Sequence, residues 1–170
     1  MQKENLIKST NFKFKLKEKY KKLAALCKKN KCTSFLDNYN ALSHGRYSVV
    51  LLSKDKSHIV KVFYDKDDYD ELRNEIKLLE ILNETYNENI IKHTGYSYKK
   101  KNPLKYIKFE YCEGSELFCW EIDGLNDKAL FTIMWQISSA VKHAHDLNIR
   151  HCDIKLENIF LKFKDLEDPI

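Results

Sequence analysis

Glycine and proline are scarce in this 170-residue chain, which contains four glycines and two prolines. Their scarcity argues against disordered tracts and against long loops without secondary structure. No apolar run approaches the roughly 18 residues of a membrane-spanning helix, so we expect no membrane segment. The first residues, Met1-Gln2-Lys3-Glu4, are not followed by the apolar region of a secretory signal. We therefore expect an intracellular protein, cytoplasmic or nuclear.

The cysteines form neither a disulfide nor a metal-site pattern. The five of them are odd in number, irregularly spaced and include no C-x-x-C pair. Without a secretory signal, we expect reduced thiols rather than a disulfide framework. The missing C-x-x-C spacing removes the usual signature of a zinc site.

Positive charge is concentrated at the N-terminus, where the lysines of the first 32 residues are opposed only by Glu4 and Glu18. Apolar residues recur there near helical spacing and predict a helix over about residues 12–30. These apolar residues are Leu16, Tyr20, Leu23 and Leu26. We expect residues 1–40 to form a basic extension. It is either a solvated segment or a surface for nucleic acid, an acidic partner or an anionic membrane.

The rest of the chain has the pattern of a folded domain, and 43% apolar with 32% charged residues fits a globular class. Two apolar runs, 49–52 and 59–63, flank a turn-like segment and predict a β-hairpin. Residues 105–111 alternate like a half-buried strand. Residues 67–82 and 127–147 each predict an amphipathic helix, whose apolar stripe we interpret as core. In the second helix the stripe consists of Leu130, Ile133, Met134, Ile137, Val141, Ala144 and Leu147.

The most specific pattern is H-x-D-x-K-x-x-N, from His151 to Asn158. In phosphoryl transfer an aspartate accepts the proton of the substrate hydroxyl, and an asparagine holds a metal ion. The pattern resembles the catalytic loop of eukaryotic-type protein kinases, H-R-D-x-x-x-x-N. The resemblance implies that Asp153 is the catalytic base, that Lys155 contacts the transferred phosphate, and that Asn158 binds Mg²⁺. A lysine at this place is typical of the Ser/Thr branch of the family.

The segment Ser43-His44-Gly45-Arg46-Tyr47-Ser48-Val49-Val50 is similar to the family's glycine-rich loop, G-x-G-x-x-G-x-V. Gly45 and Val50 match this pattern and are expected at the nucleotide site. Serines replace the outer glycines at positions 43 and 48. A serine is less free in φ than glycine and crowds the phosphates.

Lys61 lies on the second strand of the hairpin, where the family has the lysine that grips the α- and β-phosphates. Glu75 resembles the glutamate of the family's C-helix, which pairs with that lysine. Glu71 and Glu80 are alternative partners. Ile59 replaces the usual alanine two residues before the lysine, and it is expected to narrow the nucleotide pocket.

Residues 109–118 resemble the kinase hinge and the segment after it, E-Y-x-x-G-G-E-L-F. By this resemblance the backbone of Glu110 and Cys112 meets the adenine. Glu116 reaches the ribose or a basic residue of a peptide substrate, and Phe160 forms the floor of the adenine site. Cys152 replaces the arginine that normally meets a phosphorylated activation loop, so we do not expect the usual control by phosphorylation.

The resemblance implies a protein-kinase-like α+β fold. A small antiparallel β lobe with a C-helix would cover about residues 41–111, and the start of a helical large lobe about residues 112–170. A complete kinase domain is longer, and no D-F-G occurs in this sequence, so we expect a domain that is truncated before that motif. The implied cofactors are ATP and Mg²⁺, although the second metal ligand, the D-F-G aspartate, is absent from these 170 residues.

Three functions follow from these residues. The first is an ATP-dependent Ser/Thr protein kinase that acts on a protein substrate. The second is a truncated pseudokinase without activity, which binds and regulates another kinase or its substrate. Nucleic-acid binding rests only on the basic residues 1–32, which lack a strong pattern of interleaved aromatic residues, and we do not expect it.

Overall fold

A computed structural model of the chain describes residues 2–45, 47–64, 69–98, 104–117 and 126–162. The chain divides into two compact units. The first unit comprises Met1–Lys77 and His93–Tyr111, and the second comprises Leu78–Lys92 and Cys112–Ile170. No helix in the described ranges is long and apolar enough to cross a membrane. The expected domain boundaries at residues 40 and 111 stay predictions.

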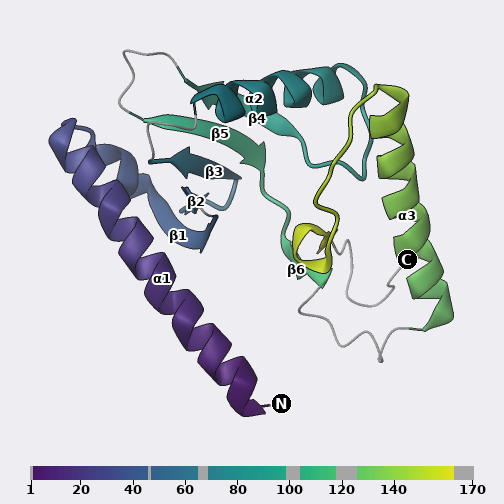
Figure 1. Cartoon of the computed structure of the whole chain (residues 1–170), viewed down its shortest axis with the longest axis horizontal. Coiled ribbons are helices and arrows are strands. Elements are labelled where there is room, and N and C mark those ends of the chain that lie inside the picture. Colours follow the sequence, from purple (N-terminus) through teal and green to yellow (C-terminus); the bar gives the residue numbers. More distant parts are fainter. Residues whose placement is uncertain (1, 46, 65–68, 99–103, 118–125, 163–170) are drawn as a thin grey trace. The chain divides into compact units, whose positions relative to one another are not determined.

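The first unit contains an antiparallel sheet with the strand order β1-β2-β3-β5-β4 (Figure 1). Its strands are β1 (Tyr39–His44), β2 (Ser48–Ser53), β3 (His58–Phe63), β4 (His93–Ser97) and β5 (Lys105–Glu110). Strands β2 and β3 are the predicted hairpin, and β5 is the predicted strand. In the hairpin turn, Asp55 accepts hydrogen bonds from the backbone N–H and the hydroxyl of Ser57, at 3.0 and 2.9 Å. Hydrogen bonds from Ser53 and Ser57 lower the pKa of Asp55 to about 2.

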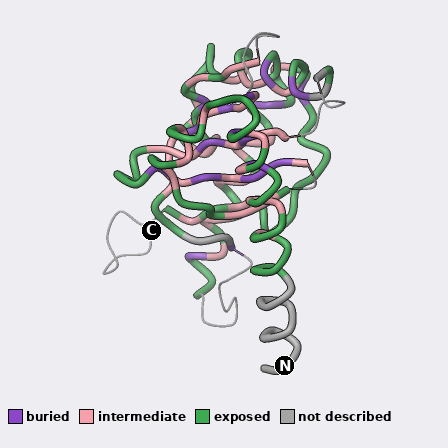
Figure 2. The backbone as a smooth tube through the Cα atoms, turned by 90° about the vertical axis from the view of Figure 1, so that its left-hand side faces the viewer, coloured by how far each residue is buried: buried purple, intermediate pink, exposed green. Residues whose placement is uncertain are grey.

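A long helix, α1 (Gln2–Lys29), precedes the sheet and is followed by the short 3₁₀ helix η1 (Thr33–Asn38). The helix that we predicted over residues 12–30 is confirmed. Its side chains Leu23 and Cys27 are fully buried in one cluster with sheet residues. The other buried members of this cluster are the strand residues Val49, Leu51, Val60 and Val62, and Leu104, which directly precedes β5. Helix α1 is therefore packed onto the sheet, although its remaining described surface is largely exposed (Figure 2).

The two faces of the sheet have different roles. Directly paired residues of neighbouring strands lie on the same face, and successive residues of one strand alternate between faces. Val60, which packs with α1, therefore faces away from Lys61. Lys61 forms an ion pair with the second helix, α2 (Tyr69–Glu84). One face of the sheet is thus covered by α1, and the other carries Lys61.

Helix α2 matches the helix predicted over residues 67–82, with Leu72 and Ile76 buried on its apolar stripe. Their spacing of four residues places them one above the other on a single helix face. Glu75 lies between these two buried residues in the sequence. Their packing fixes the rotation of α2 about its axis and therefore the direction in which Glu75 points.

The second unit contains the helix α3 (Asp127–Asp146) and a two-stranded antiparallel pair. The pair joins β6 (Gly114–Glu116) to β7 (Phe160–Lys162), and the 3₁₀ helix η4 (Leu156–Asn158) precedes β7. Helix α3 begins where predicted because Asn126 caps it: its side chain accepts a hydrogen bond of 2.8 Å from the backbone N–H of Ala129.

One part of the predicted α3 core is wrong. Met134 is 61% exposed, and its neighbours Phe131 and Trp135, which the stripe omitted, are 76% and 66% exposed. Ala144, by contrast, is buried as predicted. The helix therefore has apolar residues on more than one face. Periodicity alone cannot tell which of two apolar faces is covered, because both have helical spacing.

Candidate active site

Lys61 and Glu75 are brought together although they lie 14 residues apart in the sequence. Strand β3 presents the lysine, and its Nζ donates to Oε1 and Oε2 of Glu75 at 2.7 and 3.0 Å. The two side chains are 30% and 35% exposed. At such exposure an ion pair stabilises the fold by only about 0–1 kcal/mol. Its importance is geometric, because it holds the Lys61 ammonium in one place.

Three further side chains share the Lys61 face of the sheet. Val50 is paired directly with Lys61, and Ile59 is paired with Phe109. Phe109 is buried, while Ile59 and Val50 are half-buried. Val50 thus lies beside Lys61, and Ile59 adds bulk to the same surface.

The turn between β1 and β2 contains Gly45, whose backbone N–H donates to the Ser48 carbonyl at 3.0 Å. A Cβ at this position would come within 2.7 Å of the Ser48 hydroxyl oxygen. A side chain here would therefore require the Ser48 hydroxyl to move away. Ser48 itself is buried and Ser43 is paired with Val50, so the two serines are fixed parts of the β1–β2 strand pair.

The hinge residues lie at the end of β5 and just after it. Glu110 is the last residue of β5 and is paired with His58. Cys112 is half-buried, and its carbonyl accepts a hydrogen bond of 2.9 Å from the Gly114 N–H. The backbone of Glu116 is paired with Phe160 in the β6–β7 ladder. The Glu116 side chain lies outside what the structure describes, and Phe160 is 49% exposed.

Asp153, Lys155 and Asn158 form one cluster in the second unit. The Asp153 Oδ2 atom lies 3.0 Å from Lys155 Nζ and accepts a hydrogen bond of 2.9 Å from Asn158 Nδ2. Asn158 Nδ2 also donates to the Asp153 carbonyl at 2.8 Å, which ties the two ends of the loop together. The 3₁₀ turn of η4 between them brings the asparagine back to the aspartate. Cys152, just before the aspartate, has a φ of 61°, a conformation that few non-glycine residues adopt.

Hydrogen bonding sets the charge of this cluster. The hydrogen bond from Lys155, and next that from Asn158, holds the pKa of Asp153 below its ordinary value. The same contact with Asp153 raises the pKa of Lys155. At neutral pH the aspartate is therefore a carboxylate that can accept a proton, and the lysine is an ammonium that can stabilise a negatively charged oxygen.

The Asn158 amide suits a metal ion as a single ligand. Its nitrogen is engaged by Asp153, so its oxygen is the atom available to a cation. Mg²⁺ takes oxygen ligands and commonly uses one or two protein groups together with phosphates and water. Within the described residues, no group of three or more His, Cys, Asp or Glu side chains could hold a metal on its own.

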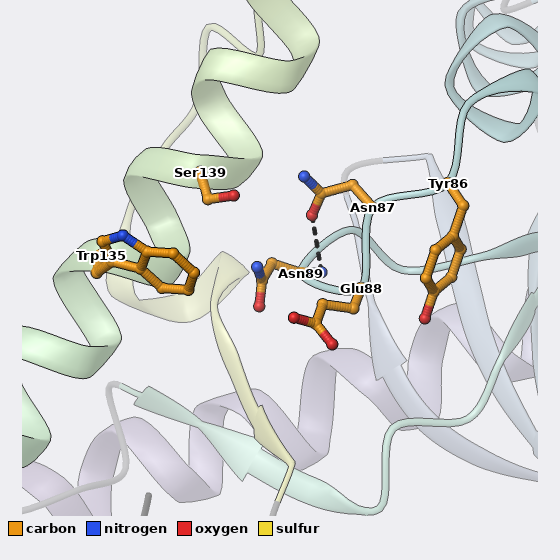
Figure 3. Close-up of a pocket in the computed structure, with 6 residues that line it drawn as sticks. All are labelled: Tyr86, Asn87, Glu88, Asn89, Trp135 and Ser139. Atoms are coloured by element: carbon orange, nitrogen blue, oxygen red, sulfur yellow. Dashed lines mark hydrogen bonds between the residues drawn. The ribbon is translucent and has the colours of Figure 1, made fainter.

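One hollow in the second unit was not anticipated from the sequence. It has a volume of about 260 Å³ and is lined by Tyr86, Asn87, Glu88, Asn89, Trp135 and Ser139. In Figure 3, Trp135 and Ser139 of α3 face the loop that carries the two asparagines. The Asn87 side chain accepts a hydrogen bond of 2.9 Å from the Asn89 N–H and so shapes that loop. None of the predicted site residues lines this hollow.

The sequence matches the family model described as the protein kinase domain over residues 37–167. The chain belongs to the protein kinase family. Among its relatives is the DNA damage response protein kinase DUN1 of Saccharomyces cerevisiae, 30% identical over 167 residues, which cover 86% of this chain and 32% of that protein. The Serine/threonine-protein kinase SIK1 of Rattus norvegicus is 28% identical over 137 residues, 75% of this chain and 17% of that protein. The resemblance to the eukaryotic Ser/Thr branch is thus confirmed.

The kinase fold is also found by structural comparison. The crystal structure of Rad53 1-466 in complex with AMP-PNP is similar with a TM-score of 0.59 at 22% identity. The match covers 79% of this chain and 40% of that chain. The predicted protein-kinase-like α+β fold is therefore confirmed. This kinase chain spans about a third or less of the length of the two curated relatives.

Proposed function

We propose that this chain is part of a Ser/Thr protein kinase, which transfers the γ-phosphoryl group of ATP to serine or threonine hydroxyls of a protein. The observation that carries the proposal is the Asp153 cluster. Its carboxylate is ionised, held by two side chains within 3.0 Å, and lies in a segment with the spacing of a kinase catalytic loop.

Asp153 accepts the proton of the attacking hydroxyl in this proposal. A carboxylate fixed by two hydrogen bonds keeps its direction, and proton acceptance from a bound hydroxyl requires a distance of about 2.6–3.2 Å. Lys155 stabilises the negative charge on the transferred group. Most of the catalysis is positioning and electrostatic stabilisation, since phosphoryl transfer needs little covalent participation of the protein.

The remaining predicted site residues bind the nucleotide in this proposal. Lys61, held by Glu75, contacts the α- and β-phosphates, and Gly45 with Val50 covers them from the glycine-rich loop. The backbones of Glu110 and Cys112 bind the adenine, Phe160 supports it, and Glu116 binds the ribose or the substrate. The AMP-PNP in the similar Rad53 structure supports ATP as the ligand. When bound, MgATP supplies the phosphoryl group and a cation that neutralises charge, and Asn158 would hold that cation.

A regulatory pseudokinase is the second candidate. It is favoured by Ile59, which narrows the surface around Lys61, and by Ser43 and Ser48 in place of two glycines of the loop. Such a protein would bind another kinase or its substrate and would transfer no phosphate. It would bind nucleotide weakly and without dependence on Mg²⁺.

Replacing the proposed base tests the two candidates. In the full-length protein, Asp153→Asn should lower phosphate transfer to a Ser/Thr peptide by about a hundredfold or more, since general-base catalysis contributes this much. ATP affinity should change little, because Asp153 does not bind the phosphates. The matched control is Asp146→Asn, on the exposed end of α3, which should leave the rate unchanged. Absence of Mg²⁺-dependent transfer by the wild-type protein would favour the pseudokinase.

A further inference from the structure

The N-terminal helix α1 contacts the glycine-rich loop directly. Lys19 Nζ donates a hydrogen bond to the Gly45 carbonyl. The ring of Phe12 is stacked on His44, with ring centroids 4.9 Å apart and planes 20° from parallel. We call these two interactions the α1–loop contact. They join a helix that precedes the matched kinase region to the loop proposed to cover the phosphates.

The helix provides a rigid base for this contact. Phe12, Leu16, Lys19, Leu23 and Cys27 follow one another at intervals of three and four residues, which places them on one helix face. Leu23 and Cys27 are fully buried against the sheet. The same face continues over roughly 16 Å from Leu23 to Phe12, since a helix rises about 1.5 Å per residue. The buried end thus fixes the position of Lys19 and Phe12.

The contact reaches the loop from the side away from Lys61. His44 is paired with Val49, which belongs to the cluster under α1, whereas Val50 is paired with Lys61 on the other face. Paired residues share a face of the sheet, so Phe12 meets His44 on the α1 side. The contact therefore restrains the loop from the face opposite to Lys61.

The restraint acts on the residue of this loop that has the greatest backbone freedom. Only Gly45 of the three glycine positions is kept, and its N–H already bonds to Ser48. Lys19 donates a hydrogen bond to the carbonyl of this same residue. Both backbone groups of Gly45 are therefore engaged: its N–H bonds within the β1–β2 turn, and its carbonyl accepts from α1. Order established before binding lowers the entropy cost of closing a loop on its ligand.

We infer that Lys19 and Phe12 are positioning residues, through which α1 holds the glycine-rich loop in its nucleotide-binding conformation. The inference rests on the proposed ATP site. By this inference, residues 12–29 contribute to nucleotide affinity. They act as a component of the first unit and not as a separate basic tail.

Two pairs of variants in the full-length protein test this inference. Lys19→Met and Phe12→Ala remove the contact. Lys17→Met and Phe14→Ala are the matched controls, because they change the same residue types at exposed places on the same helix. Thermal unfolding should stay within a few degrees of wild type in all four proteins, since Leu23 and Cys27 are unchanged.

Amide hydrogen exchange measures how well the glycine-rich loop is ordered, and ATP titration measures the affinity for the nucleotide. In Lys19→Met and Phe12→Ala, amides of residues 43–49 should exchange faster, and the dissociation constant for MgATP should rise about three- to tenfold, as expected for one partly exposed charged contact. The controls should match wild type in both measurements. Unchanged exchange, or a dissociation constant that is unchanged or lower, would overturn the inference.

The same data separate failure of this inference from failure of the proposed function. If the wild-type protein binds no ATP, the proposed function fails, and the effect of α1 on affinity falls with it. The exchange rates still decide whether α1 holds the loop. If the wild-type protein binds ATP and the variants bind it equally well, only the role of α1 is wrong.

Discussion

Asp153 receives its hydrogen bonds from residues two and five positions further along the chain. Contacts over such short separations depend mainly on local turns. The kinase resemblance singled out these three residues, but it did not predict their hydrogen bonds to one another. The pairing of Lys61 with Glu75 spans a strand and a helix, and it was anticipated only through the kinase resemblance. The contact of Lys19 with Gly45 spans 26 residues and follows no motif, and it was not foreseen.

Removal of Lys155 should raise the pKa of Asp153. The hydrogen bond from Lys155 is the largest cause of the lowered pKa, and loss of a group that favours the charged form moves a carboxyl pKa upward. Carbon NMR titration of Asp153 in Lys155→Met should therefore show a higher midpoint than in wild type. Asp55, whose pKa of about 2 depends on Ser53 and Ser57, is the internal control and should not move. An unchanged midpoint for Asp153 would mean that the contact with Lys155 does not persist in solution.

At the scale of elements, periodicity predicted the hairpin, α2 and α3, because alternation and three- or four-residue spacing are properties of the element itself. The residues against which an element packs are not a property of that element. The apolar residues Leu16, Tyr20, Leu23 and Leu26 indicated a helix, yet its lysines suggested a solvated extension. The structure instead packs this helix on β2 and β3. The partners lie more than twenty residues away, and nothing in the spacing specifies them.

Truncating the anchor of α1 should destabilise the first unit. Leu23 is fully buried, so Leu23→Ala should lower the free energy of unfolding by about 2–5 kcal/mol. The adjacent exposed substitution Lys22→Ala should change it by less than about 0.5 kcal/mol. Urea unfolding of both variants measures the difference. A loss below about 1 kcal/mol for Leu23→Ala would show that α1 is not part of the core of this unit.

At the scale of the whole molecule, each unit contains part of the predicted motifs, with Lys61 and Glu75 in the first and the Asp153 cluster in the second. The order of motifs along the chain allowed the kinase fold to be predicted before any contact was known. Periodicity could not predict which apolar residues of α3 are exposed, here Phe131, Met134 and Trp135, since it marks a face without saying what covers it.

The most direct test of the central claim is transfer of labelled γ-phosphate from MgATP to a serine- or threonine-containing peptide by the full-length protein, with and without Lys61. The wild-type protein should transfer phosphate. Lys61→Met should lower the rate at least about tenfold, because it removes the cation paired with Glu75. Lys54→Met, in the exposed turn of the same hairpin, should leave the rate unchanged. Absence of transfer by the wild-type protein, or equal rates with and without Lys61, would contradict the proposal.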